Sequence, residues 1–381
     1  AGAYAPIYNN VVAIIVFVGF LVVVAPQADS LSSLTDAQVW WLGLGTTAGV
    51  ALQALILLPA VVRSGYRFSF RTDWKGAGLS RAGGLAAWTL GLVVVNQIAY
   101  AVVTRLATSA NVAALQAGEV AAGLTTYQKA HLIFILPHSV VTVSLVTALL
   151  PHLSRMAHDG ELDLLGRRVG SAARTVLALI IPMSVLLAVT APEISVLLFG
   201  NGVAGAEAAR LAGQVVALFA IGLPAYSLIY VLFRAWYAME NTRTPFWFAV
   251  LINLINLSIA IPLFNNADVG DKIGTLAISY SAAYIVAAAV AWIRLGRIVP
   301  ELGTAALLTS LFKLSAAAGV AGGLTHLLLG PSLFGSGFLG DFASVSATWL
   351  VGGLVFIALA HLLKVDEVGR ALAMVRARLG K

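Results

Sequence analysis

The stretch that decides the fold is Leu136-Pro-His-Ser-Val-Val-Thr-Val-Ser-Leu-Val-Thr-Ala-Leu-Leu-Pro-His-Leu-Ser-Arg155. It is apolar over the length of a membrane-spanning helix, carries Pro137 inside the apolar part and ends on a basic residue. A proline removes a backbone donor and frees a carbonyl, which a lipid-exposed helix tolerates poorly and a cavity-lining helix tolerates well. We therefore expect this helix to lie beside a polar space, with Pro137 as its hinge.

The composition of the whole chain predicts a membrane protein. Of its 381 residues, 60% are hydrophobic and only 10% are charged, whereas soluble domains average about 25% charged residues. The fold class is therefore an all-α polytopic membrane protein. With ~20 apolar residues per span, about ten transmembrane helices are expected, over residues 5–24, 40–62, 85–106, 124–150, 175–198, 211–239, 245–264, 273–293, 304–329 and 342–363.

The charges between these spans alternate in sign. Most of the 23 basic residues fall in one set of loops, and most acidic residues fall in the other set. By the positive-inside rule, the basic set faces the cytoplasm, which places both ends of the chain there. Basic loops are the ordinary result of membrane insertion, so no nucleic-acid partner is expected. The basic set holds Arg63, Arg67, Arg71, Lys75, Arg81, Arg155, Arg167, Arg168, Arg174, Arg234, Arg243, Arg294, Arg297, Lys364, Arg370, Arg376, Arg378 and Lys381.

The sequence offers little that resembles an enzyme. It contains no phosphate-binding loop of the form GxxxxGK[ST], no HExxH motif and no carboxylate pair within a span. The absence of cysteine excludes disulfides and thiolate metal sites. His131 and His138 share a helical face but lack a third ligand. We expect no catalytic residue, no metal and no cofactor.

Polar residues inside two apolar spans are the candidate binding residues. The third span carries Asn96, Gln97 and Arg105, and the fourth carries Lys129 and His131. Such residues are costly at mid-membrane and therefore indicate a cavity or a helix partner. Arg105, Lys129 and His131 could neutralise an anion such as a phosphate. In the alternative reading, Lys129 lies at the outer interface and pairs with an acid, and the amides only bond neighbouring helices.

Several motifs, in order along nearly the whole chain, carry a resemblance to a known family. The chain resembles the MurJ/MviN family of lipid II flippases, within the multidrug/oligosaccharidyl-lipid/polysaccharide exporter superfamily. The motifs are Ala5-Pro-Ile-Tyr-Asn-Asn10, Leu136-Pro137 followed by Val143-Ser-Leu-Val-Thr-Ala-Leu-Leu-Pro-His-Leu-Ser-Arg155, Leu197-Leu-Phe-Gly-Asn-Gly202, Arg234-Ala-Trp-Tyr-Ala, and Asn241-Thr-Arg-Thr-Pro245.

The resemblance implies a fourteen-helix, V-shaped fold of two six-helix lobes, of which the first four spans are absent here. Residues 1–83 would then hold the last two helices of the N-lobe and a basic cytoplasmic loop. Residues 84–297 would form the six-helix C-lobe. Residues 298–364 would form a helix pair with a groove for the lipid tail, and residues 365–381 a basic amphipathic cytoplasmic tail.

The resemblance also implies the function. The protein would be a transporter, not an enzyme, that moves the peptidoglycan precursor lipid II from the inner to the outer leaflet of the bacterial cytoplasmic membrane by alternating access. Its partners would be lipid II, membrane lipids, and cell-wall synthesis and division proteins. Two alternatives stay open, which are an exporter of another polyprenyl-linked glycan and a non-transporting scaffold for wall synthesis. Some relatives bind sodium through C-lobe carboxylates, whereas the third and seventh spans here offer Asn96, Asn253 and Asn256.

Overall fold

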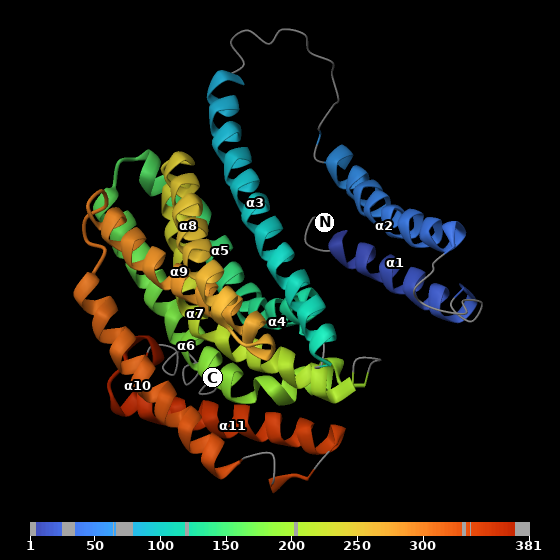
Figure 1. Ribbon diagram of the computed structural model, residues 1–381. Helices are drawn as coiled ribbons and strands as arrows, with labels where there is room; N and C mark the ends of the chain where they lie inside the picture. The colour runs from blue at the N-terminus through green and yellow to red at the C-terminus, as the bar shows by residue number, and fades with distance from the viewer. Residues whose placement is uncertain are drawn as a thin grey trace. The chain divides into compact units, whose positions relative to one another are not determined.

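The computed structural model describes residues 5–24, 35–63, 65, 79–118, 122–201, 205–329, 333–335 and 337–369. Within these residues the chain is helical and forms no strand (Figure 1). Most of the predicted basic loop before residue 84, and the predicted tail from residue 370 onward, lie outside the described residues.

Nine helices in the described part of the chain are long and apolar enough to cross a membrane, and a shorter apolar helix spans Ile7–Val22. Each of the ten predicted spans overlaps one of these, which confirms the all-α membrane class. The elements are α1 (Ala5–Gly19), the π-helix η1 (Phe20–Val24), α2 (Asp36–Arg63), α3 (Leu79–Ala117), α4 (Leu124–Pro137), the π-helix η3 (His138–Val143), α5 (Ser144–His158), α6 (Leu162–Phe199), α7 (Gly205–Ala238), α8 (Arg243–Asn266), the 3-10 turn η4 (Val269–Asp271), α9 (Lys272–Gly296), α10 (Thr304–Leu328) and α11 (Phe338–Leu362).

The helices fall into two compact units, residues 1–79 and residues 80–381. In the first unit α1 and α2 pack as an antiparallel pair. Gly45 faces Val16 and Gly49 faces Asn9, so closely that a Cβ atom on either glycine would clash with its neighbour. Trp41 Nε1 also donates a hydrogen bond to the carbonyl of Val16 over 3.3 Å. Small residues four apart allow this close approach, as they do in many membrane helix pairs.

The core of the second unit is the pair α6 and α7, with α9 packed on α7 and α8 on α9. Trp236 and Phe219 of α7 are fully buried there. Two glycines set the helix spacing, because a Cβ at Gly213 would lie 2.5 Å from Pro192 Cα and one at Gly222 would lie 2.7 Å from Ser281 Cα. Close backbone contact of this kind stabilises helix association in a membrane, where apolar side chains contact lipid tails as favourably as they contact other helices.

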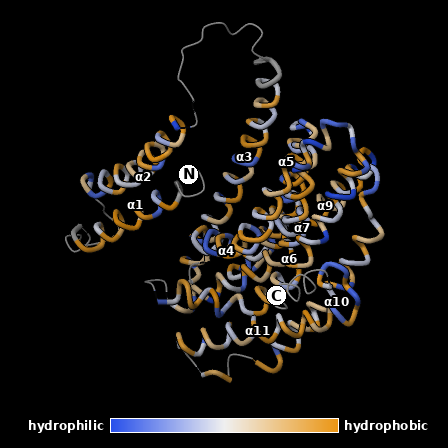
Figure 2. Tube along the Cα trace, turned by 180° about the vertical axis from the view of Figure 1, so that it is seen from behind, coloured by the Kyte–Doolittle hydropathy of each residue, from blue (hydrophilic) through white to orange (hydrophobic). Residues whose placement is uncertain are grey.

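The exterior of the second unit is apolar, as a bilayer requires. Figure 2 shows hydrophobic residues along the helix bodies, with hydrophilic colour gathered toward the helix ends and connections. Large side chains such as Phe312, Leu254 and Leu350 are more than half exposed. Contiguous exposed apolar surface on this scale is incompatible with water and fits a membrane-embedded protein.

Several helices are longer than the apolar windows predicted. α6 begins at Leu162, well before the expected residue 175, and the fourth span continues to His158. The turn between them is tight, with Gly160 in the left-handed region at φ 76°. A helix keeps its backbone hydrogen bonds after it leaves the lipid, so the apolar window marks the membrane-embedded part rather than the helix end.

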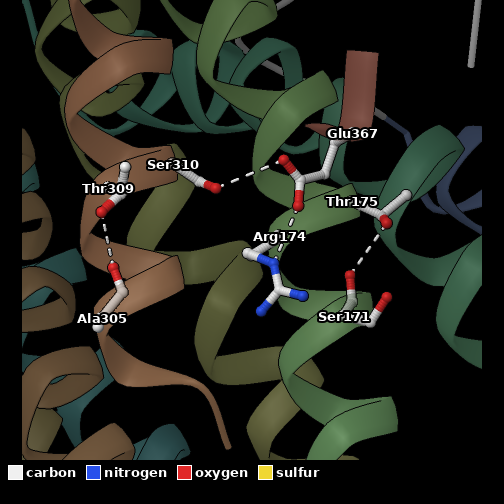
Figure 3. A network of polar contacts seen from close by, with 7 residues as sticks. All are labelled: Ser171, Arg174, Thr175, Ala305, Thr309, Ser310 and Glu367. Carbon is white, nitrogen blue, oxygen red and sulfur yellow. Dashed lines mark hydrogen bonds and ion pairs between the residues drawn. The ribbon is translucent and has the colours of Figure 1, made fainter. Parts of the chain in front are cut away.

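Both α10 and α11 pack on α6 and on each other, and a polar network secures the segment that follows α11. Arg174 Nε of α6 lies 2.9 Å from Glu367 Oε1, and Ser310 Oγ of α10 donates to Glu367 Oε2 over 3.4 Å (Figure 3). The Glu367 side chain is only 3% exposed. A carboxylate this well covered must be paired, so Glu367 links the chain after α11 to two neighbouring helices.

We predict that Gly213→Ala destabilises the α6–α7 pair by about 1–3 kcal/mol, because the added methyl meets backbone atoms that cannot move aside. Gly319→Ala on α10 is the matched control, since nothing lies within 4 Å of its added Cβ. The measurement is thermal unfolding of the purified protein in detergent. Equal midpoints for the two variants would contradict the packing described here.

Candidate functional site

A cavity of about 450 Å³ opens in the second unit among α3, α4, α8 and α9. Its wall combines amide, phenol and imidazole groups with apolar side chains, and no carboxylate, lysine or arginine is among the described residues that line it. The lining residues are Asn96, Gln97, Ala99, Tyr100, Val103, Tyr127, Gln128, His131, Leu132, Ile135, Ile252, Asn253, Asn256, Tyr280 and Tyr284.

Hydrogen bonds between side chains connect the helices around this cavity. Asn253 Nδ2 of α8 donates to Asn96 Oδ1 of α3 over 2.8 Å, and also to its own helix at the Ala249 carbonyl. Gln128 Nε2 of α4 donates to the Tyr100 hydroxyl over 3.0 Å. These bonds hold α3 to both neighbours with groups that can exchange partners for a ligand.

One polar atom of the wall has no partner among the described residues. Asn256 is 6% exposed, and its Oδ1 is buried without a hydrogen bond. An unsatisfied buried amide oxygen costs about 1–3 kcal/mol. A donor that enters the cavity, from water or a ligand, would recover this energy.

Aromatic rings form the deep side of the cavity. The ring centroids of Phe219 and Tyr280 lie 5.7 Å and 5.8 Å from that of His131, both nearly perpendicular to it. Tyr280 is in turn 4.7 Å from Tyr284. Edge-to-face packing of this kind fixes the rings, so the wall is stiff and presents its polar edges in defined directions.

The predicted binding residues are brought together only in part. Asn96, Gln97 and His131 line the same cavity. Arg105 is exposed and lies two helical turns beyond Gln97, while Lys129 is turned away from the cavity with Nζ 5.0 Å from the centre of the Phe199 ring. Helix geometry explains this, because residues two apart point about 200° apart around the axis.

Several lining residues were not among the predicted binding residues. Tyr127, Gln128, Tyr280 and Tyr284 contribute much of the polar wall. A signal was present, because Tyr280 and Tyr284 are four apart in an apolar span, as are Tyr127 and His131. Residues four apart share a helix face. The polarity of a phenol is weak enough that the hydropathy pattern hides it.

Pro137 lies where the fourth span changes its helix type. α4 ends at Pro137, the π-helix η3 follows directly, and α5 resumes at Ser144. A π turn shifts the hydrogen-bond register and often marks functional positions. The hinge prediction for Pro137 therefore has a local structural basis, although its motion stays a prediction.

The two motifs around the α7–α8 connection have structural roles. The Asn241 side chain accepts a hydrogen bond from the Thr244 amide over 3.0 Å, at the start of α8. The Arg243 guanidinium lies 5.5 Å from the Trp88 ring of α3, a cation–π contact. Arg234 donates to the hydroxyl of Tyr230 and lies over its ring. Asn241 thus stabilises the start of α8 and Arg243 links it to α3, whereas the Arg234–Tyr230 contact lies within α7.

A second cavity, of about 770 Å³, surrounds the Arg174–Glu367 pair near the end of α11. Three of its charged groups are already engaged, since Arg174 pairs with Glu367 and Lys313 Nζ donates to the Lys364 carbonyl over 3.3 Å. Its polar side chains therefore link neighbouring helices to one another. The first cavity is the better candidate site.

The family model described as "Lipid II flippase MurJ" matches residues 1–348. The chain belongs to the MurJ family. It is 29% identical over 269 residues to a probable lipid II flippase MurJ of Rhizobium meliloti, covering 69% of this chain and 46% of that protein. It is 26% identical over 356 residues to one of Thermotoga maritima, covering 92% of this chain and 66% of that protein.

A solved structure shares the fold. The chain superposes on a lipid II flippase MurJ in an inward closed conformation with a TM-score of 0.68, at 18% identity, covering 96% of this chain and 68% of that one. The chain thus spans from about half to two thirds of the length of the MurJ relatives named here. The membership establishes a multi-span membrane protein of a flippase family.

We predict that the cavity is hydrated. Because the chain has no cysteine, single cysteines report cleanly. Gln97→Cys, on the cavity wall, should react with a water-soluble thiol reagent, whereas Ile98→Cys, at the same depth but on the outward face, should not. The measurement is labelling rate in native membranes. Similar rates at both positions would rule out a distinct water-filled space.

Proposed function

We propose that this protein moves lipid II across the bacterial cytoplasmic membrane by alternating access. The observation that carries the proposal is the match of the MurJ family model to residues 1–348. The second unit supports it, because transporters bind their substrates in polar cavities between membrane helices, and this cavity is bounded by a helix that contains Pro137 and a π-helical turn. The transport of lipid is movement without covalent chemistry, so no catalytic residue is needed.

The neutral cavity suits the head group of such a lipid. Amides and phenols exchange hydrogen bonds with sugar hydroxyls and peptide groups, and they do so without the desolvation cost of a full charge. Asn96, Gln97 and His131 would make these contacts, with Asn256 offering a free acceptor. Arg105 and Lys129 stay as sequence-based candidates for the diphosphate.

An apolar recess beside α10 could hold the lipid tail. It measures about 480 Å³ and lies among α6, α7 and α10. A polyprenyl chain is pure hydrocarbon, and burial of each CH₂ contributes about 0.8 kcal/mol. The lining residues are Ser184, Val185, Ala188, Val189, Pro192, Ala220, Ile221 and His326.

We predict that the native protein moves fluorescent lipid II between leaflets of proteoliposomes, and that Asn253→Ala slows this movement about tenfold or more through loss of the bridge to Asn96. Asn266→Ala is the control, since Asn266 lies on the same helix outside the cavity and donates a hydrogen bond to the Pro262 carbonyl of its own helix. The rate is followed by loss of fluorescence to an impermeant quencher.

The same assay decides between the alternatives. Movement of a different polyprenyl-diphosphate glycan, with lipid II left in place, would favour the broader exporter reading. Movement of neither lipid, together with retention of cell-wall synthesis proteins on the purified protein, would favour the scaffold reading. Equal rates for Asn253→Ala and Asn266→Ala would remove the cavity from the mechanism.

We predict a cytoplasmic orientation for the turn between α5 and α6, because moving the arginines in the helix ends beside it, Arg155, Arg167 and Arg168, across the membrane is disfavoured. His158→Cys at this turn should be labelled by an impermeant thiol reagent only after cells are opened. Asp268→Cys, between α8 and α9 and also exposed, should be labelled in intact cells. The reverse pattern would invert the topology.

A further inference from the structure

A histidine in the middle of the fourth span is not explained by the candidate cavity. His138 follows Pro137 directly, begins the π-helix η3 and is only 3% exposed. A 3.0 Å hydrogen bond joins its Nδ1 to Ser227 Oγ of α7. Ionisable residues at mid-membrane are rare and costly, and in transporters they often carry protons. This one lies at the point where its helix changes register.

The surroundings of His138 restrict which groups could share a proton with it. η3 packs against α4, α5, α6 and α7. α7 presents Tyr226 and Tyr230, with ring centroids 4.6 Å and 5.0 Å from His138, and Arg234 bonds Tyr230 beyond them. α4 contributes His131, two turns earlier, while α5 up to Pro151 and α6 between Thr175 and Pro192 carry no titratable side chain.

Carboxylates are the usual proton carriers in transporters, but none lies near the middle of the described helices α3 to α9. In the described parts of α3 to α9, every Asp and Glu lies within two turns of a helix end or in a connection. Histidine is the side chain whose charge ordinarily changes between pH 5 and 8. Because His131 belongs to the cavity wall, His138 is the mid-span group that is free for this role.

A series of phenols connects His138 with the cavity. Tyr280 and Tyr284 line the cavity, Tyr284 is 4.9 Å from Tyr226 between ring centroids, and Tyr226 is the ring beside His138. A phenol both donates and accepts a hydrogen bond. The rings of Tyr284 and Tyr226 therefore form a continuous row of phenols between the cavity and His138.

The hydroxyl of Thr142 could accept a hydrogen bond from the second ring nitrogen of a protonated His138. A protonated imidazole has two N–H donors, whereas Ser227 takes part at only one ring nitrogen. Thr142, four residues after His138 in η3, is fully buried, and its Oγ1 has no partner among the described residues. A change in the register of η3 would offer this hydroxyl to the second nitrogen.

We propose that His138 is a proton-binding site that couples proton movement to lipid translocation, an inference that rests on the proposed flippase function. Neutral His138 bonds Ser227 and stabilises the present bend after Pro137. A proton taken from the cavity side through the tyrosines makes His138 a cation, which is costly at this depth unless water or a new acceptor reaches it. Protonation thereby favours a second arrangement of η3, with Thr142 as acceptor.

The coupling can be measured with lipid II in proteoliposomes under a pH gradient. Exchange of one proton for one lipid would bias lipid II toward the leaflet on the acidic side, by at most about tenfold per pH unit. This direction does not depend on the orientation of the protein in the vesicle. We expect the bias in the native protein and in His158→Gln, a control on the same span that is exposed at its end.

We expect His138→Gln to abolish the bias while lipid II still equilibrates between leaflets, because glutamine keeps a hydrogen bond but cannot take a proton. Thr142→Val, which keeps His138 and removes the second acceptor, should reduce the bias. It also provides the test if His138→Gln does not fold. An undiminished bias in either variant would overturn the proposal.

Two further results separate this proposal from the proposed function. Equilibration of lipid II by the native protein without any bias would overturn proton coupling and leave the flippase function intact. Nitrogen NMR of labelled histidine, with His138→Gln to assign the signal, tests proton binding without transport. A His138 signal that does not change between pH 5 and 8 would overturn the proton site, whatever the transport assay shows.

Discussion

The hydrocarbon interior of a bilayer offers no hydrogen bonds, and the structure follows from that constraint. Every backbone amide and carbonyl in a span must be satisfied within the protein, which is why the described chain is helical. The same rule governs side chains. Polar groups inside the second unit pair across helices, as Asn253 does with Asn96 and as Ser281 does with the Leu218 carbonyl. Two of the buried side-chain atoms without a partner among the described residues, Asn256 Oδ1 and Thr142 Oγ1, lie at the cavity and in the π-helix.

The constraint also determines how the helices associate. Lipid tails are as apolar as leucine, so apolar side chains gain little by turning inward, and close backbone contact supplies the attraction instead. Gly213 and Gly222 bring α7 against α6 and α9, and Gly45 and Gly49 do the same for α1 and α2. Large residues such as Leu350 then face outward. The interior combines these small residues with aromatic rings and with fully buried aliphatic side chains such as Leu165, Ile180 and Leu223.

Within this packing, the fourth span differs from its neighbours. α6 and α7 form an extensively packed pair, whereas α4, η3 and α5 combine a proline, a π turn and a buried histidine in one continuous span. The cavity lies along the α4 part of this span. A change in helix register at η3 would alter the direction of α4 against α5, and with it the shape of the cavity. His138 therefore places a titratable side chain at the turn where a change in helix register would reshape the cavity.

The sequence by itself determined the class of fold, the approximate spans and the family, because membrane insertion depends on local hydropathy and the motifs are local too. It also made Asn96, Gln97 and His131 candidates for a binding site, since polar residues are conspicuous in apolar spans. Only the tertiary structure decided that these three share a cavity with Tyr280 and Tyr284, while Lys129 turns toward Phe199. The physical reason is that rotation of a helix about its own axis is fixed by packing against its neighbours. A hydropathy pattern without strong amphipathicity does not specify that rotation.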